Sequence, residues 1–163
     1  MKQVSFFYFV LMLGIVIIGC RTSNNLIGDN GDILGCMESS ACNYDSKANI
    51  PNVCISIQNV DLSTNILEVW MMNNIPVEGF QFNISGVTII SASEGSAQSN
   101  GMTQSNSEHI ILGFSLSGDA IPPGNGVLTQ LVFSESSGLI CLSLPVFSDN
   151  SGEALLVELG ECF

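Results

Sequence analysis

The sequence has very few basic residues. Its 163 residues include 3 Lys and Arg against 15 Asp and Glu, so the formal net charge is −12 at pH 7. Contacts to phosphate groups need clustered lysine or arginine side chains, and we therefore expect no nucleic acid partner. The acidic residues are scattered along the chain, as on a solvated surface that keeps an exported protein soluble.

The sequence also lacks the patterns of common catalytic sites. It contains no GxSxG nucleophile motif. Its one histidine, His109, stands at the start of a predicted strand, where we expect a surface or edge residue. Nothing in the sequence places two carboxylates across a cleft, as glycoside hydrolysis requires. We assign no catalytic residue and expect that the protein is not an enzyme.

The N-terminus, in contrast, is strongly apolar. A single early charge, Lys2, precedes the run VSFFYFVLMLGIVIIG, which ends at Gly19. The run is short for a membrane-spanning helix, which needs about 20 apolar residues. A positive residue followed by an apolar run of this length is typical of a secretory signal peptide, predicted here as residues 1–19.

The residues Ile17, Ile18, Gly19 and Cys20 resemble a bacterial lipobox. This resemblance implies that residues 1–19 are removed and that Cys20 carries a lipid; an uncleaved anchor helix is the alternative. Both readings tether the protein to a membrane, and several acyl chains on one cysteine make such an attachment stable. We therefore expect a lipid-anchored protein of the cell envelope, at the outer membrane or the cell surface.

The mature chain divides into three parts. Residues 20–34 are rich in Asn, Gly and Asp and are predicted to form a flexible tether. Residues 35–54 contain three cysteines and form a short connector. From residue 55 to 163, short alternating apolar runs are separated by Gly, Asn, Ser and Pro, which predicts an all-β sandwich domain.

Alternation along the chain predicts which strand residues face the core. ILEVWMMN, residues 66–73, is apolar on both faces and is predicted to be buried on both sides. The polar stretch at residues 91–108 is predicted to be a long loop, and no helix longer than a turn is required. In EGFQFNIS and HIILGFSLSG, the residues expected to point inward are Phe80, Phe82 and Ile84, and Ile110, Leu112, Phe114 and Leu116.

The run VEGFQFNISGVTIISASEG, followed by ILGFSLSGDAIPPGNGVLTQLVFS, resembles the cohesin-like sandwich domain over roughly residues 55–163. The resemblance implies a two-sheet jelly-roll sandwich of about eight or nine strands, a fold related to several carbohydrate-binding modules. In this chain the sandwich would follow the signal segment and a small disulfide-stapled connector.

With Cys20 assigned to the lipid, five cysteines remain in an oxidising compartment. Cys141 lies in a predicted strand, and Cys162 follows 21 positions later, beyond the return strand EALLVEL. We expect a disulfide between these two, which would stabilise the fold by about 3 kcal/mol on the chain-entropy model. The other three cysteines lack the spacings of zinc or redox sites.

The stretch GCMESSACNYDSKANIPNVC resembles a short repeat of secreted and cell-surface bacterial proteins, akin to calcium-binding thrombospondin type 3 repeats. The resemblance implies a disulfide-stapled connector with Cys36 bonded to Cys54, with Cys42 as the alternative partner. A structural Ca²⁺ is the second reading, although Ca²⁺ takes six to eight oxygen ligands. Its candidate ligands are Glu38, Asn43, Asp45 and Asn49.

Three functions are compatible with a sandwich that has no catalytic site. The favoured one is a binding module for a protein partner, with polysaccharide binding and a passive envelope spacer as alternatives. Exposed aromatic residues in a line would favour sugar, because sugars stack on aromatic rings. A flat apolar patch rimmed by polar groups would favour a protein.

Overall fold

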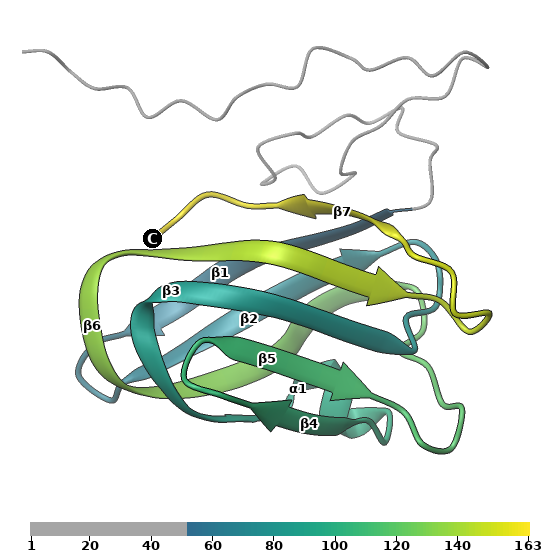
Figure 1. Cartoon of the computed structure of the whole chain (residues 1–163), viewed down its shortest axis with the longest axis horizontal. Coiled ribbons are helices and arrows are strands. Elements are labelled where there is room, and N and C mark those ends of the chain that lie inside the picture. Colours follow the sequence, from purple (N-terminus) through teal and green to yellow (C-terminus); the bar gives the residue numbers. More distant parts are fainter. Residues whose placement is uncertain (1–51) are drawn as a thin grey trace, which may run out of the picture.

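Residues 52–163, the part of the chain that this computed structural model describes, are built almost entirely from β-strands (Figure 1). The strands are β1 (Asn52–Asp61), β2 (Ile66–Asn73), β3 (Gly79–Ser93), β4 (Thr103–Asn106), β5 (Ile110–Phe114), β6 (Gly124–Ser148) and β7 (Leu156–Leu159). One short helix, α1 (Gly95–Ser99), connects β3 to β4.

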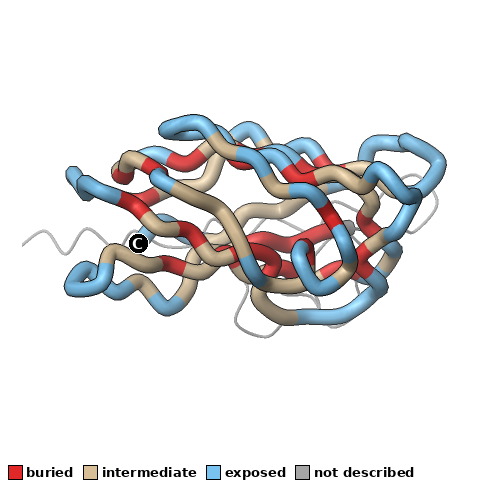
Figure 2. The backbone as a smooth tube through the Cα atoms, turned by 90° about the horizontal axis from the view of Figure 1, so that it is seen from below, coloured by how far each residue is buried: buried red, intermediate tan, exposed pale blue. Residues whose placement is uncertain are grey.

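The hydrogen-bonded strand order is β4-β5-β3-β6-β2-β1-β7, with only the β1–β7 pair parallel. The sheet folds into a two-layer jelly-roll sandwich because β3 and β6 are long, paired to each other and bent together (Figures 1 and 2). Their pairing runs from Gly79 opposite Ser148 to Ser93 opposite Gln130, with a register shift beside Gly86. Gly86 has φ 81°, and a Cβ there would lie 2.2 Å from a backbone oxygen of β6.

Two layers result from this bend. The front layer contains β4, β5, residues 79–85 of β3 and residues 141–148 of β6. The back layer contains β7, β1, β2, residues 124–133 of β6 and residues 89–93 of β3. Because β3 and β6 each enter both layers, the seven strands supply nine strand segments to the sandwich.

The core lies between the layers and follows the alternation of β2 and β3. Phe80, Phe82 and Ile84 on β3 are buried, as the sequence predicts. On β2, every second residue from Leu67 is buried, while the residues between them are only partly covered. The ring centroid of Phe80 lies 6.0 Å from that of Phe82 and 5.7 Å from that of Phe147, so aromatic contacts tie β3 to β6.

The predicted orientation of β5 is wrong. Ile111 is fully buried and Gly113 also faces the core, whereas Ile110 and Leu112 lie on the outer surface. Leu116, also predicted to point inward, is 84% exposed. In β5, the reason is the ring of Phe80, the cross-strand partner of Gly113, which occupies the space that a side chain at 113 would need. A Cβ at Gly113 would stand 2.2 Å from that ring.

The predicted polar loop at 91–108 holds more structure than expected. It contains the end of β3, α1 and the edge strand β4, which pairs with β5. Side-chain amides replace apolar packing here: Asn106 accepts a hydrogen bond from the backbone N–H of Ala92 at 3.2 Å. Gln104 donates to the carbonyl of Glu94 at 3.0 Å. A strand held in this way has no apolar alternation to reveal it.

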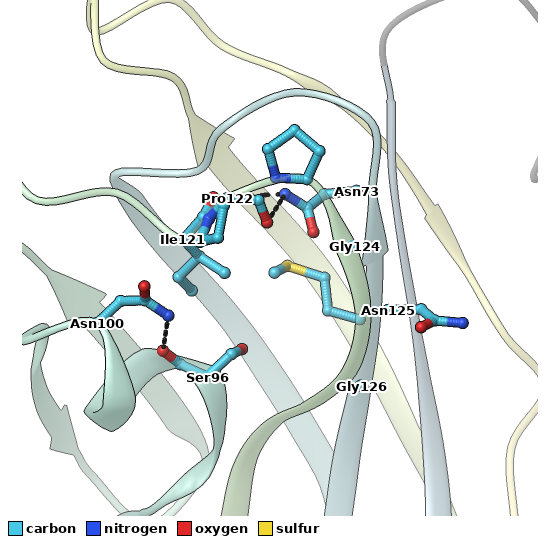
Figure 3. Close-up of a pocket in the computed structure, with 10 residues that line it drawn as sticks. Asn73, Ser96, Asn100, Ile121, Pro122, Gly124, Asn125 and Gly126 are labelled. Atoms are coloured by element: carbon cyan, nitrogen blue, oxygen red, sulfur yellow. Dashed lines mark hydrogen bonds between the residues drawn. The ribbon is translucent and has the colours of Figure 1, made fainter.

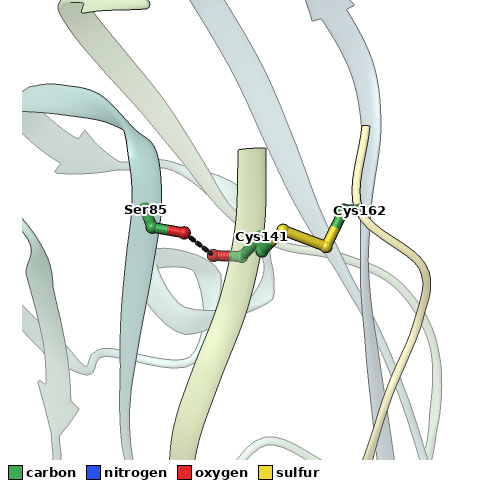
Figure 4. The surroundings of a disulfide bond; sticks show 3 residues. All are labelled: Ser85, Cys141 and Cys162. Atoms are coloured by element: carbon green, nitrogen blue, oxygen red, sulfur yellow. Dashed lines mark hydrogen bonds between the residues drawn. A yellow bond between two sulfur atoms is a disulfide. The ribbon is translucent and has the colours of Figure 1, made fainter. Parts of the chain in front are cut away.

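The C-terminal segment joins the two layers. Gly160 donates its N–H to the carbonyl of Ile55 on β1, and Phe163 exchanges two backbone hydrogen bonds of 2.9 Å with Ile140 on β6. A disulfide joins Cys141 to Cys162 at the same place (Figure 4). The end of the chain is thus fastened to β1 of the back layer and to β6 of the front layer.

Candidate binding face

The outward surface of the front layer, called the front face below, carries the most distinctive arrangement of side chains. Strand register sets a row across four strands, in which Ser105 on β4 lies opposite Leu112 on β5. Leu112 lies opposite Gln81 on β3, and Gln81 lies opposite Val146 on β6. In a neighbouring row, Ile110 lies opposite Asn83.

Branched aliphatic side chains on this face are open to solvent. Ile110 and Leu112 are 39% and 38% exposed, and Leu144 and Val146 are 70% and 56% exposed. The amide side chains of Gln81 and Asn83 on β3 stand between these two apolar strands, and the polar side chains of β4 lie on the other side of β5. The face therefore offers aliphatic contacts and hydrogen-bonding groups side by side.

A β-bulge shapes the middle of the front face. Between Gln81 and Asn83 on β3, the facing part of β6 carries one additional residue, and Leu144 has φ 48°. A bulky residue rarely adopts this left-handed conformation, which costs roughly 1–2 kcal/mol. Bulges commonly re-aim a side chain beside a functional surface, and this one presents Leu144 to solvent.

The charge around the face is of one sign. All three basic residues, Lys2, Arg21 and Lys47, precede residue 52, so residues 52–163 contain acids and no lysine or arginine. Glu108 stands exposed just before β5. Asp149 follows β6 directly, and hydrogen bonds from the Ser151 side chain and backbone lower the pKa of its carboxyl.

One end of the sandwich has a small pocket of about 180 Å³ between α1, the end of β2 and the loop before β6 (Figure 3). The side-chain amides of Asn73 and Asn100, which line it, form hydrogen bonds within the fold. Asn73 is buried and donates to the carbonyls of Ile75 at 2.8 Å and Pro122 at 3.1 Å. Asn100 donates to the carbonyl of Ser96 at 2.8 Å. Small-molecule sites are typically about 300–1,000 Å³, so this pocket is a poor candidate for one.

Aromatic residues do not form an exposed line on any sheet of the described part of the chain. Most phenylalanines there are in the core, Phe114 and Trp70 are half-covered, and Phe163 at the C-terminus is exposed. Trp70 lies on the outward surface of the back layer and donates its indole N–H to Glu68 at 2.9 Å. The arrangement therefore differs from the stacked aromatic platform expected of a sugar-binding face.

Several predicted site residues lie outside the described part of the chain: the lipidation site Cys20, the cysteines Cys36 and Cys42, and the candidate calcium ligands Glu38, Asn43, Asp45 and Asn49. Cys54 lies on β1 and is disulfide-bonded. Between residues 52 and 163, no three His, Cys, Asp or Glu side chains gather as metal ligands would. His109 is exposed just before β5, with its Nδ1 3.2 Å from the carbonyl of Val87.

The same range, 52–163, holds no helix that is both long and apolar enough to cross a membrane.

Sequence reasoning missed the residues of the front face. The sequence pattern predicts Ile110 and Leu112 in the core. Because Ile110, Ile111 and Leu112 are all apolar, alternation alone does not show which of them point inward. The available signal was Gly113, whose missing side chain fits under the neighbouring Phe80 ring. The bulge at Leu144 has no signal in the sequence, because leucine is unfavourable at a positive φ.

No protein-family model and no curated protein matches this sequence. Among solved structures, a cohesin in a type I cohesin–dockerin complex from Clostridium thermocellum is 15% identical, with a TM-score of 0.49 over 71% of this chain and 94% of that one. A non-cellulosomal cohesin from Archaeoglobus fulgidus is 15% identical, with a TM-score of 0.47 over 68% and 86%. A type III cohesin module from the cell-surface anchoring scaffoldin ScaE of Ruminococcus flavefaciens is 12% identical, with a TM-score of 0.40 over 80% and 99%.

Proposed function

We propose that this protein is a non-catalytic binding module of the cell envelope, anchored through a lipid on Cys20, whose front face binds a protein partner. The observation that carries the proposal is the row Leu112–Gln81–Val146 across three strands, with Ile110 and Leu144 beside it. The lipobox-like residues before Cys20 support the anchor, and the cohesin-like sequence motifs agree with a protein partner.

The front face is large enough for one part of a protein interface. Four strands about 4.8 Å apart span roughly 14 Å, and five or six residues of a strand span roughly 17–20 Å. The flat area is therefore about 250 Å², while a stable protein interface buries about 800 Å² on each partner. Loops at the strand ends must contribute the remainder, including the exposed loop 115–120 after β5.

The chemistry of the face points the same way. When a partner covers the exposed aliphatic groups, the removal of their surface from water favours binding by about 25 cal/mol per Å² of apolar area. The side-chain amides of Gln81 and Asn83, which lie between the aliphatic groups, can form hydrogen bonds that fix the orientation of the partner. A sugar would need aromatic surface for stacking, and this face offers mainly branched aliphatic side chains.

The test is capture of envelope proteins by three versions of residues 20–163 in which Cys20→Ser prevents lipidation. Leu112→Ser with Val146→Ser removes the two aliphatic ends of the row. The matched control is Ile90→Ser, which removes an aliphatic side chain that is 60% exposed elsewhere on β3. We expect one protein to be captured by the parent and the control and to be lost, by tenfold or more, with the row variant.

Two results would contradict the proposal. Equal capture by all three versions would place the interaction away from the front face. Retention on a polysaccharide panel that survives the Leu112→Ser, Val146→Ser change would favour the sugar-binding alternative. Circular dichroism of each version shows that a loss of capture does not come from unfolding.

A further inference from the structure

A second surface of the sandwich, the outward side of β1 and β2 in the back layer, is called the back face here. Val53 and Ile55 on β1 point into the core, so Cys54 between them lies on the back face. Met72 of β2 is its antiparallel partner and Glu158 of β7 its parallel partner. The back face is the side of the sandwich opposite to the front face (Figure 1).

Apolar and acidic side chains stand together on this face. Trp70 is the cross-strand partner of Ser56, two positions along β1 from Cys54, and the side chains of Trp70 and Met72 are only partly exposed. Glu68 and Glu158 supply two carboxylates. Burial raises the pKa of the Glu158 carboxyl, so this acid stands in a place with reduced access to water.

The disulfide at Cys54 restricts where the partner cysteine can lie. Cys36 and Cys42, its candidate partners, precede it by 18 and 12 positions. The Cα atoms of bonded cysteines lie about 5.5–6 Å apart, so a residue joined to Cys54 must lie directly over the surface from which that side chain projects.

The composition of that segment fits the surface. Residues 35–51 contain the apolar side chains of Met37, Tyr44 and Ile50, one base, Lys47, and two acids, Glu38 and Asp45. Lys47 is the only lysine that remains after residue 19. Apolar groups facing Trp70 and a cation near two carboxylates are complementary in both hydrophobicity and charge.

We propose that the Cys-rich segment, residues 35–51, packs on the back face, covering Trp70 and Met72 and bringing Lys47 near Glu68 and Glu158. The segment would then be a fixed part of the domain. Because the tether, residues 20–34, leads into this segment, the front face would point away from the membrane anchor. The inference concerns the back face and holds whether or not the front face binds a protein.

The single tryptophan of the chain makes the proposal testable, because all tryptophan fluorescence comes from Trp70. Acrylamide quenching is measured on residues 20–163 with Cys20→Ser, which is the parent, and on the same chain with Cys54→Ser. We expect the quenching constant to rise at least twofold in the Cys54→Ser chain, with a red shift of the emission. The matched control, Cys141→Ser with Cys162→Ser, removes the other disulfide and should leave both quantities unchanged.

A second measurement does not depend on the folding of a variant. Carbodiimide joins an amine to a carboxylate in contact, and Lys47 is the only lysine of the parent. Cross-links of the N-terminal amine are distinguished from those of Lys47 by the peptides in which they are found. Mass spectrometry should find Lys47 joined to Glu68 or Glu158. Cross-links from Lys47 only to carboxylates elsewhere, or none, together with unchanged quenching in the Cys54→Ser chain, would overturn the proposal. So would quenching of the parent that changes with protein concentration, because a second copy would then be the cover.

Discussion

Two aspartates form the same local hydrogen bonds at turns that join consecutive strands. Asp61 at the end of β1 accepts hydrogen bonds from the backbone N–H and the hydroxyl of Ser63, at 2.8 and 2.6 Å. Asp149 after β6 accepts the equivalent pair from Ser151 at 2.8 and 2.7 Å. Short polar residues that bond the backbone two positions ahead are favoured in turns for this reason.

The pKa of Asp61 gives a prediction for the first of these turns. Hydrogen bonds from the Ser63 side chain, the largest cause, and from Thr64 lower the pKa from 3.8 to about 2. A lowered pKa means that the ionised carboxylate favours the folded state, so this contribution is complete above pH 3.8 and is lost as the pH falls toward 2. NMR titration should give this value, and Ser63→Ala should move it toward 3.8. An unchanged pKa in Ser63→Ala would show that the hydroxyl does not hold the carboxylate.

Gly113 leads to a prediction about stability. Its missing side chain leaves room for the Phe80 ring, and a Cβ would approach that ring to 2.2 Å. Gly113→Ala should therefore lower the free energy of unfolding by about 1–3 kcal/mol, as overpacking does. Gly124→Ala is the control, because a Cβ there meets only a backbone oxygen at 4.0 Å. Urea denaturation measures both, and equal stability of the two variants would refute the role assigned to the Phe80 ring.

At the level of strands, local alternation located β2 and the start of β3, and it predicted the inward residues of β3. For β2 it predicted burial on both sides, whereas only one face is fully buried. It failed on β5, where consecutive apolar residues leave the phase open and the deciding contact, Phe80 over Gly113, comes from another strand. It missed β4 because side-chain amides rather than apolar packing hold that edge. The front face depends on both elements, so sequence patterns could predict the sandwich but could not locate its outer apolar residues.

The bulge in β6 allows a substitution that is predicted to weaken binding without lowering the stability of the fold. Leu144 in a left-handed conformation costs roughly 1–2 kcal/mol, while glycine adopts it freely at an entropic cost of about 0.5–1 kcal/mol. Leu144→Gly should therefore leave the free energy of unfolding unchanged or raise it by up to about 1.5 kcal/mol, although an aliphatic side chain is lost. The same variant should weaken capture of the protein partner severalfold. A clear loss of stability would show instead that Leu144 packs against the fold.

The molecule as a whole has a marked division of charge. Every lysine and arginine lies before residue 52, while the sandwich carries acids both on its loops and on its strands. Such a domain repels other copies of itself and attracts basic surfaces over distances comparable to the Debye length, about 8 Å at physiological ionic strength. A partner for the front face is therefore expected to surround an apolar patch with lysine and arginine.

Salt dependence of binding follows from this charge. Once a partner is captured, raising the ionic strength from about 0.05 to 0.5 M should slow its association by about tenfold, because steering is screened while apolar contacts are not. Glu108 stands beside Ile110 at the start of β5, so Glu108→Gln should reduce the slope of this dependence. Glu135→Gln, on the part of β6 that pairs with Thr88, is the matched control and should leave the slope unchanged. An association rate that does not vary with salt would mean that the partner contacts only the aliphatic row. The acidic surface would then contribute to solubility and not to binding.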